Sequence, residues 1–141
     1  MPLSNQDLRK AGLKVTLPRI KILELLENSP VHHLSAEDVY KALLEQGEDV
    51  GLATVYRVLT QFEAAGLVIR HHFEGGNSVF ELSDVDHHDH IVCIKCDRVE
   101  EFSDAVVEAR QEKISAEMGY ELTGHSFYLY GICPQCRGAK P

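Results

Sequence analysis

Residues 85–96, VDHHDHIVCIKC, contain three histidines, two cysteines and two aspartates, all of them side chains that bind metal ions. If residues 87–92 belong to a β-strand, successive side chains point to opposite faces of it. His87 and Asp89 then share one face, and His88 and His90 share the other. This alternation predicts two metal sites that each need ligands from elsewhere in the chain. The alternative is a solvated, acidic, histidine-rich turn.

The further ligands of these two sites are open at this point, because several acids and histidines lie at suitable places. The candidates are His32, His33, Glu81, Glu100, Glu101, Glu108 and His125. Nitrogen and oxygen ligands without a thiolate suit Fe(II), Mn(II), Co(II) or Zn(II). His71 and His72 have no obvious partners, and we expect both to be solvated.

The four cysteines form two C-x2-C pairs, Cys93 with Cys96 and Cys133 with Cys136. Two such pairs can supply four thiolates to a tetrahedral, structural zinc ion, which leaves no open position for a substrate. A zinc ion there would tie residues 93–96 to the end of the chain. The alternatives are four reduced thiols or two redox-active pairs.

The composition limits the classes of protein that hold these sites. At 44% hydrophobic residues the chain folds, and its 141 residues suffice for two small domains. No apolar run is long enough for a membrane span, and the N-terminus lacks the apolar segment of a secretory signal, so we expect a cytoplasmic protein. The formal net charge of −8 argues against a nucleic-acid partner, but basic residues gather before position 23: Arg9, Lys10, Lys14, Arg19 and Lys21.

The first half of the sequence predicts three helices, within residues 16–29, 35–47 and 51–66, followed by a hairpin around EGGN. Ser35 is a good helix cap, and Val55, Val58, Leu59 and Phe62 form one apolar stripe on the third helix. Three helices and a hairpin are the pattern of a winged helix-turn-helix domain. We place this domain at residues 1–83.

A helix-turn-helix reads DNA with side chains of its second helix, which lies in the major groove. On the polar face of the helix at 51–66, Thr54, Tyr56 and Arg57 have suitable side chains, because arginine pairs with guanine and an aromatic ring packs on a thymine methyl. Lys14 and Arg19 could contact phosphates or the minor groove. The alternative is a protein-binding module in which Arg57 is merely a solvated charge.

The second half, residues 84–141, predicts a small α/β domain after a polar hinge at 83–86. Strands are expected at 90–95, 98–102 and 125–133, and a helix at 104–119 with Ser103 as its cap. Val107, Ile114 and Met118 form an apolar stripe on that helix. Because so small a domain buries little core, we expect it to dimerise. The fold class is therefore α+β, a winged-helix domain followed by a dimerisation domain.

Catalysis is poorly supported. The sequence contains no G-x-S-x-G, P-loop or H-E-x-x-H motif, and the cysteine pairs lack a thioredoxin-like βαβ setting. We therefore expect a protein that is not an enzyme.

Taken together, several segments resemble the ferric uptake regulator family of bacteria. They are GLKVTLPRIKIL, SAEDVYKAL, GLATVYRVLTQFEAAGLV, EGGNSVFEL, HHDHIVCIKC, EEFSD, EARQ and LTGHSFYLYGIC, and the resemblance as a whole runs from about residue 9 to residue 136. The resemblance implies a homodimeric repressor of iron-uptake genes, whose dimers can pair further, with A·T-rich inverted repeats as the double-stranded operator. Ferrous iron is the implied corepressor, for which Mn(II), Co(II) or Zn(II) can substitute.

The resemblance also implies roles for particular residues. The sensing site would consist of His33, Glu81, His88, His90 and Glu101. A second site would consist of His87, Asp89, Glu108 and His125, and structural zinc would bind Cys93, Cys96, Cys133 and Cys136. Tyr56 and Arg57 match positions that contact bases, and Lys14 matches a minor-groove lysine.

Two alternatives to an iron sensor remain at this stage. Sister families with the same architecture sense zinc, manganese, nickel, peroxide or haem, and their ligands are also mixed. A protein of a different class would handle metal or redox chemistry without binding DNA.

Overall fold

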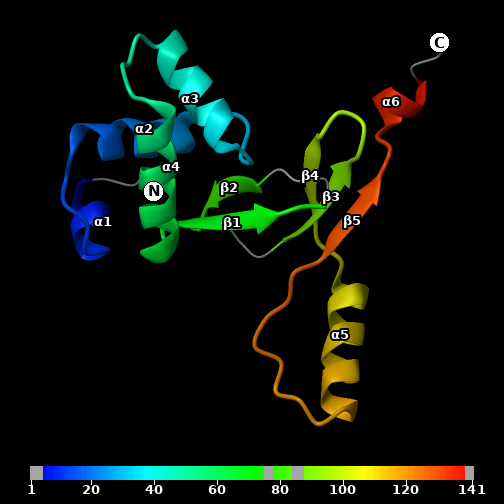
Figure 1. The fold of residues 1–141 in the computed structure, drawn as a ribbon. Helices are drawn as coiled ribbons and strands as arrows, with labels where there is room; N and C mark the ends of the chain where they lie inside the picture. The colour runs from blue at the N-terminus through cyan, green and yellow to red at the C-terminus, as the bar shows by residue number, and fades with distance from the viewer. Residues whose placement is uncertain (1–4, 75–77, 84–87, 139–141) are drawn as a thin grey trace. The chain divides into compact units, whose positions relative to one another are not determined.

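The computed structural model describes residues 5–74, 78–83 and 88–138. Contacts divide the chain into an N-terminal unit, Met1–Val85, and a C-terminal unit, Asp86–Pro141. The helices and strands, in chain order and as labelled in Figure 1, are α1 (Asn5–Lys10), α2 (Leu17–Asn28), α3 (Ala36–Glu45), α4 (Leu52–Ala64), β1 (Val68–His72), β2 (Ser78–Leu82), β3 (Asp89–Cys93), β4 (Val99–Phe102), α5 (Ala105–Glu117), β5 (Tyr128–Gly131) and α6 (Pro134–Gly138).

The three predicted helices of the N-terminal unit are α2, α3 and α4, which pack on one another around a common core. The predicted stripe of α4 is buried, and Phe62 and Val55 are fully inaccessible to solvent. Helix α1 was not predicted from the sequence, but it adds the fully buried Leu8 to the same core. The α+β class and the winged helix-turn-helix are confirmed.

Local signals explain where these helices begin and end. Ser35 accepts a hydrogen bond from the backbone N–H of Asp38, and the Asp38 carboxylate accepts one from the backbone N–H of Ser35, which forms a complete capping box at the start of α3. Helix α4 ends before Gly66, which has a φ of +80°, a conformation that glycine adopts without strain.

The hairpin of the N-terminal unit pairs β1 with β2 in antiparallel register, with Ile69 opposite Glu81 and His71 opposite Val79. A third segment joins this sheet through an isolated bridge, because Leu34 and Phe80 exchange backbone hydrogen bonds of 3.2 and 2.8 Å. An antiparallel bridge between Leu34 and Phe80 also sets His33 beside Glu81.

The C-terminal unit contains a three-stranded sheet in the order β4–β3–β5, which confirms the three expected strands. Strand β3 pairs antiparallel with β4 and parallel with β5. In Figure 1 helix α5 projects from this sheet, and the chain returns along it to β5. Because β3 is the central strand, its side chains meet those of both neighbours.

Helix α5 begins at a residue other than the one we predicted. Asp104, and not Ser103, is its N-cap, and the Asp104 carboxylate accepts hydrogen bonds of 2.9 and 3.2 Å from the backbone N–H groups of Val106 and Val107. Both residues are good caps, and a carboxylate has the additional advantage of a negative charge at a helix N-terminus.

We expect Asp104→Ala to lower the free energy of unfolding by about 1 kcal/mol, because two N–H groups at the start of α5 lose their acceptor. Urea denaturation followed by circular dichroism measures this change. Ser103→Ala is the matched control and should leave the midpoint unchanged. Equal losses from the two substitutions would contradict the assignment of Asp104 as the cap.

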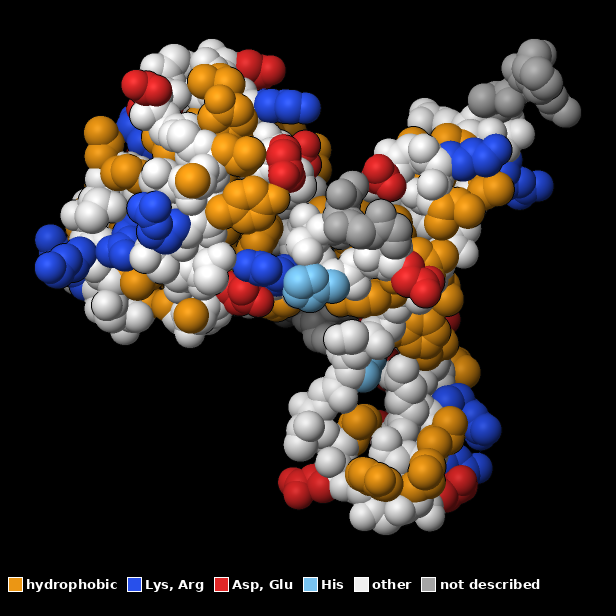
Figure 2. Space-filling model, viewed as in Figure 1, with side chains coloured by type: hydrophobic (Ala, Val, Ile, Leu, Met, Phe, Trp, Pro, Cys, Tyr) orange, Lys and Arg blue, Asp and Glu red, His pale blue; other side chains and the backbone are white. Residues whose placement is uncertain are grey.

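None of the described residues of α5 is buried in the single chain. Figure 2 shows hydrophobic side chains on the surface of this projecting part, and Val106 and Met118 are 72% and 68% exposed. So much apolar surface on one helix is typical of a protein–protein interface.

Within the described ranges, the helices are all too short or too polar to cross a membrane.

Candidate metal centres and nucleic-acid interface

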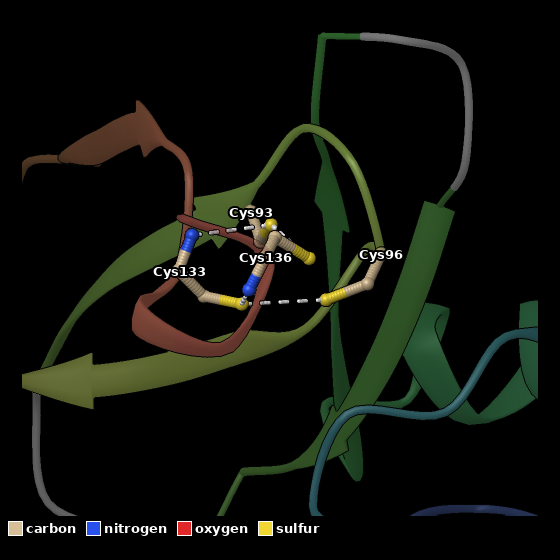
Figure 3. Close-up of side chains that lie close together, drawn as sticks. All are labelled: Cys93, Cys96, Cys133 and Cys136. Carbon is tan, nitrogen blue, oxygen red and sulfur yellow. Dashed lines mark hydrogen bonds between the residues drawn. The ribbon is translucent and has the colours of Figure 1, made fainter. Parts of the chain in front are cut away.

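The four cysteines converge at one end of the C-terminal sheet (Figure 3). Cys93 ends β3, and the turn to Cys96 closes with Asp97 at a φ of +63° and a hydrogen bond from the Asp97 N–H to the carbonyl of Cys93. Cys133 and Cys136 lie at α6, directly after β5. The parallel pairing of Cys93 with Gly131 brings the two pairs together.

The distances between sulfurs fit a metal site and not a disulfide. Cys93 Sγ lies 3.8 Å from Cys136 Sγ, and Cys96 Sγ lies 3.8 Å from Cys133 Sγ. A disulfide bond is about 2.05 Å long. In a tetrahedral site with Zn–S bonds of about 2.3 Å, the edge between two sulfurs is roughly 3.8 Å. The four residues therefore fit a zinc ion without rearrangement.

The two pairs of sulfurs that lie 3.8 Å apart are Cys93 with Cys136 and Cys96 with Cys133. Each pair combines a thiol whose pKa is lowered with one whose pKa is raised. A hydrogen bond from the backbone N–H of Cys133, 3.3 Å long, lowers the pKa of Cys93 to about 6. The backbone N–H of Cys136 likewise lowers the pKa of Cys133. The hydrogen bond with Cys133 raises the pKa of Cys136 to about 12. The pKa of Cys96 is also raised: the backbone at Arg98 lowers it, but the Cys93 and Cys133 sulfurs and burial together outweigh that effect.

A second cluster in the C-terminal unit consists of Asp89, Glu108 and His125, whose ligand atoms lie within 4.8 Å of one another. His125 Nε2 is 3.2 Å from Asp89 Oδ1, and Asp89 is only 1% exposed. Asp89 comes from β3, Glu108 from α5 and His125 from the chain before β5. His87, the fourth residue expected here, lies outside the described residues.

The opposite face of β3 gathers His88, His90 and Glu101. The sheet register sets His90 directly across from Glu101, and His88 Nε2 lies 3.4 Å from Glu101 Oε2. The rings of His88 and His90 lie 4.7 Å apart, and His90 is 2% exposed. The expected separation of His88 and His90 from Asp89 therefore holds among the residues that can be described.

In the N-terminal unit, His33 and Glu81 form a buried pair. His33 Nε2 lies 3.3 Å from Glu81 Oε2, and the Glu81 side chain is almost inaccessible. His32, the other candidate, is exposed on the surface. The Leu34–Phe80 bridge explains why His33, and not His32, contacts Glu81, because it turns the side chain at position 33 toward β2. The sequence contains no comparable local signal.

Our expectation of a solvated His71 is wrong. His71 is 8% exposed, and its Nε2 lies 2.5 Å from Glu81 Oε1. His72, on the other face of the strand, is exposed and contacts Ser78, as expected of a residue on the wing. Strand alternation could have separated these two histidines, but only the register of the hairpin brings His71 to Glu81.

On α4, two of the residues predicted to contact DNA, Tyr56 and Arg57, are exposed, and the third, Thr54, is half-buried. The Tyr56 hydroxyl donates a 2.7 Å hydrogen bond to Glu37 of α3. This bond lowers the pKa of Glu37 and raises that of Tyr56. With its hydroxyl engaged, the Tyr56 ring is oriented and offers mainly apolar surface.

The basic residues of the N-terminal segment differ from one another in their contacts. Lys14 is exposed, as a phosphate or minor-groove contact must be. Arg19 is half-buried: its guanidinium donates to the Lys14 carbonyl at 2.8 Å and to Gln61 of α4 at 2.9 and 3.3 Å. Arg19 therefore fixes the backbone at Lys14 relative to α4.

Comparisons with known proteins are consistent with this arrangement. The model of the ferric uptake regulator family matches residues 10–130. The ferric uptake regulation protein of Legionella pneumophila is 68% identical over 133 residues, which cover 94% of this chain and 98% of that protein. The chain belongs to the ferric uptake regulator family.

Two solved structures of ferric uptake regulators agree with this assignment. The regulator of Vibrio cholerae is 62% identical, with a TM-score of 0.88, and the match covers 92% of this chain and 98% of that one. The regulator of Pseudomonas aeruginosa, determined with manganese, is 61% identical, with a TM-score of 0.80 and coverage of 94% and 98%.

Membership of the ferric uptake regulator family settles the general function. The chain is a metal-responsive transcriptional repressor that binds DNA and acts as a dimer. This function is therefore favoured over that of a protein of a different class without DNA binding, and the family is one of transcription regulators. The clusters described above are consistent with metal binding.

Proposed function

We propose that the chain represses iron-uptake genes when ferrous iron joins ligands from its two units. The proposed sensing ligands are His33 and Glu81 of the N-terminal unit with His88, His90 and Glu101 of the C-terminal unit. The observation that carries the proposal is that each unit holds its share of nitrogen and oxygen ligands already gathered, at 3.3 Å in one and 3.4 Å in the other. Mixed ligands of this kind suit Fe(II), and Mn(II), Co(II) or Zn(II) can replace it.

A metal with ligands in both units would fix the angle between them. In a dimer, that angle sets the separation of the two α4 helices, whereas the helical repeat of the duplex sets the separation of the half-sites. The metal then favours the conformation that binds DNA, and DNA in turn strengthens metal binding. Rearrangement of the DNA-binding domains in the Vibrio cholerae relative supports such a mechanism.

The other two clusters have different proposed roles. Asp89, Glu108 and His125, completed by His87, would hold a second divalent metal in the dimerisation domain. Cys93, Cys96, Cys133 and Cys136 would hold structural zinc, which would compensate for the small hydrophobic core in the described part of this unit. The exposed face of α5 would join two chains in the dimer, and dimers can pair further on DNA.

For the operator, we propose an A·T-rich inverted repeat read by α4. The Tyr56 ring, held by Glu37, would pack on a thymine methyl, and Arg57 would pair with a base edge, with Thr54 beside them. Lys14 would enter the minor groove. Arg19 would hold Lys14 in place through its backbone and need not reach DNA with its own charge.

The test is a gel shift of the zinc-loaded dimer on an A·T-rich inverted repeat, under anaerobic conditions, with and without Fe(II). Binding that needs Fe(II) at micromolar free concentrations supports the proposal. A response to zinc at far lower free concentrations, with none to Fe(II), would identify a sister zinc sensor instead.

We expect Arg57→Ala to weaken operator binding about 5- to 150-fold, which corresponds to the roughly 1–3 kcal/mol of one good base contact. The loss should be largest on the operator and small on random DNA. The control is Arg98→Ala, an exposed arginine of the C-terminal unit, which should change operator binding little. An equal loss of affinity for the operator and for random DNA would show that Arg57 contacts phosphates and not bases.

A further inference from the structure

The carboxylate of Glu81 divides its two oxygens between two histidines. Oε2 lies 3.3 Å from His33 Nε2, and Oε1 lies 2.5 Å from His71 Nε2. The hairpin register produces this arrangement. Glu81 pairs with Ile69, and His71 lies two positions further along β1, so its side chain is on the same face and diagonal to Glu81.

We propose that His71 is a positioning residue for Glu81, which it holds as a ligand that gives one oxygen to the metal. This role rests on the proposed function, in which Glu81 is a metal ligand. A carboxylate accepts hydrogen bonds and does not donate them, so His71 donates from Nε2 to Oε1. With Oε1 engaged, Oε2 remains on the side of His33, where it is available to the proposed metal.

The surroundings of His71 fix the direction of this bond. The His71 ring stacks on Phe73 at a centroid distance of 5.9 Å and an interplanar angle of 4°, and both residues are buried. A buried ring that is stacked in this way has little freedom to turn away from Glu81. Partners that orient metal ligands commonly contribute about 10- to 100-fold to metal affinity.

The number of oxygens that Glu81 supplies also affects which metal the site prefers. A carboxylate that binds through both oxygens fills two positions around the metal, whereas one held by His71 fills only one. His71 therefore leaves a position for the histidine nitrogens. We expect its loss to weaken Mn(II) binding and to alter the geometry of the bound metal.

The experiment measures Mn(II) binding to the full-length, zinc-loaded dimer by electron paramagnetic resonance of free Mn(II). His71→Phe keeps a ring against Phe73 and removes the donor, and it should weaken one class of Mn(II) site about 10- to 100-fold. His71→Gln keeps a donor of similar reach and should lose less. His72→Phe, on the exposed face of the same strand, should change nothing.

A double-mutant cycle separates positioning from a general structural effect. If His71 acts through Glu81, His71→Phe should have no further effect in the Glu81→Gln background. The cobalt absorption spectrum of His71→Phe should also change in the bands that report coordination geometry. An equal loss in both backgrounds, or wild-type affinity in His71→Phe, would overturn the positioning role.

The same measurements distinguish this role from the proposed function. If Glu81→Gln leaves every class of Mn(II) site unchanged, Glu81 is not a ligand and the proposed sensing site fails. If Glu81→Gln removes one class while His71→Phe leaves the affinity of every class unchanged, the sensing site stands and only the role of His71 fails. Circular dichroism of each variant checks that the hairpin is folded.

Discussion

Cys93→Ser should release zinc and, with it, the folded C-terminal unit and the dimer. Cys93 is 4% exposed and contacts both cysteines of the other C-x2-C pair, because its sulfur lies 3.8 Å from Cys136 Sγ and accepts a hydrogen bond from the backbone N–H of Cys133. Few other buried hydrophobic residues support the described part of this unit. Structural zinc contributes on the order of 10 kcal/mol or more to folding, which exceeds what most small domains possess in total.

Elemental analysis measures the loss of zinc, and the mass determined by sedimentation measures the loss of the dimer. Wild-type protein stripped by a strong chelator is the matched control and should behave as Cys93→Ser does. A stable, zinc-free dimer of the variant would contradict the structural role of the site.

Lowering the pH should weaken zinc binding, as Cys93→Ser does. Because the pKa of Cys93 is lowered to about 6, its thiolate is present above that pH and is lost as the pH falls through it. Cys136, with a pKa raised to about 12, carries a proton at neutral pH that zinc must displace. Zinc affinity therefore increases with pH and falls more steeply below about pH 6, where a proton competes with zinc for Cys93 as well.

His33→Ala and His90→Ala should each abolish the stimulation of DNA binding by metal while leaving the dimer intact. Linkage between two ligands commonly amounts to about 5- to 150-fold in affinity, and we expect this factor to fall close to one. Because the two histidines belong to different units but are proposed to hold one metal, the double variant should lose no more than either single variant.

Operator affinity with and without Mn(II) or Fe(II) provides the measurement, and sedimentation checks the dimer. His32→Ala is the control, since His32 neighbours His33 but is exposed. Wild-type metal dependence in either single variant would show that the proposed sensing site is wrong. Losses that add in the double variant would instead indicate two separate sites.

Features that depend on short stretches of sequence could be predicted well. The Ser35 capping box, the buried face of α4 and the cysteine spacing each depend on residues a few positions apart, and each is found in the structure. The separation of Asp89 from His90 followed from strand alternation alone.

Features that depend on pairing between distant segments could not be predicted. The choice of His33 over His32 depends on the bridge between Leu34 and Phe80, which are 46 positions apart in sequence, since 80 − 34 = 46. The burial of His71 depends on the hairpin register. The prediction of the α5 cap was wrong for a different reason. Ser103 and Asp104 are both good caps, and only the hydrogen bonds of Asp104 distinguish them.

The pairing register of strand β3 decides which cluster each of its side chains joins. The strand begins with Asp89 and His90, which belong to the two different clusters of histidines and carboxylates, and it ends with Cys93. A slip of one residue against β4 or β5 would exchange the two faces and send Asp89 and His90 to the wrong clusters. Such a slip would also carry Cys93 away from Gly131 and break the four-sulfur cluster. If zinc binds the four sulfurs as we propose, it therefore stabilises the correct register of the strand, and only a chain in that register has its proposed iron ligands in place.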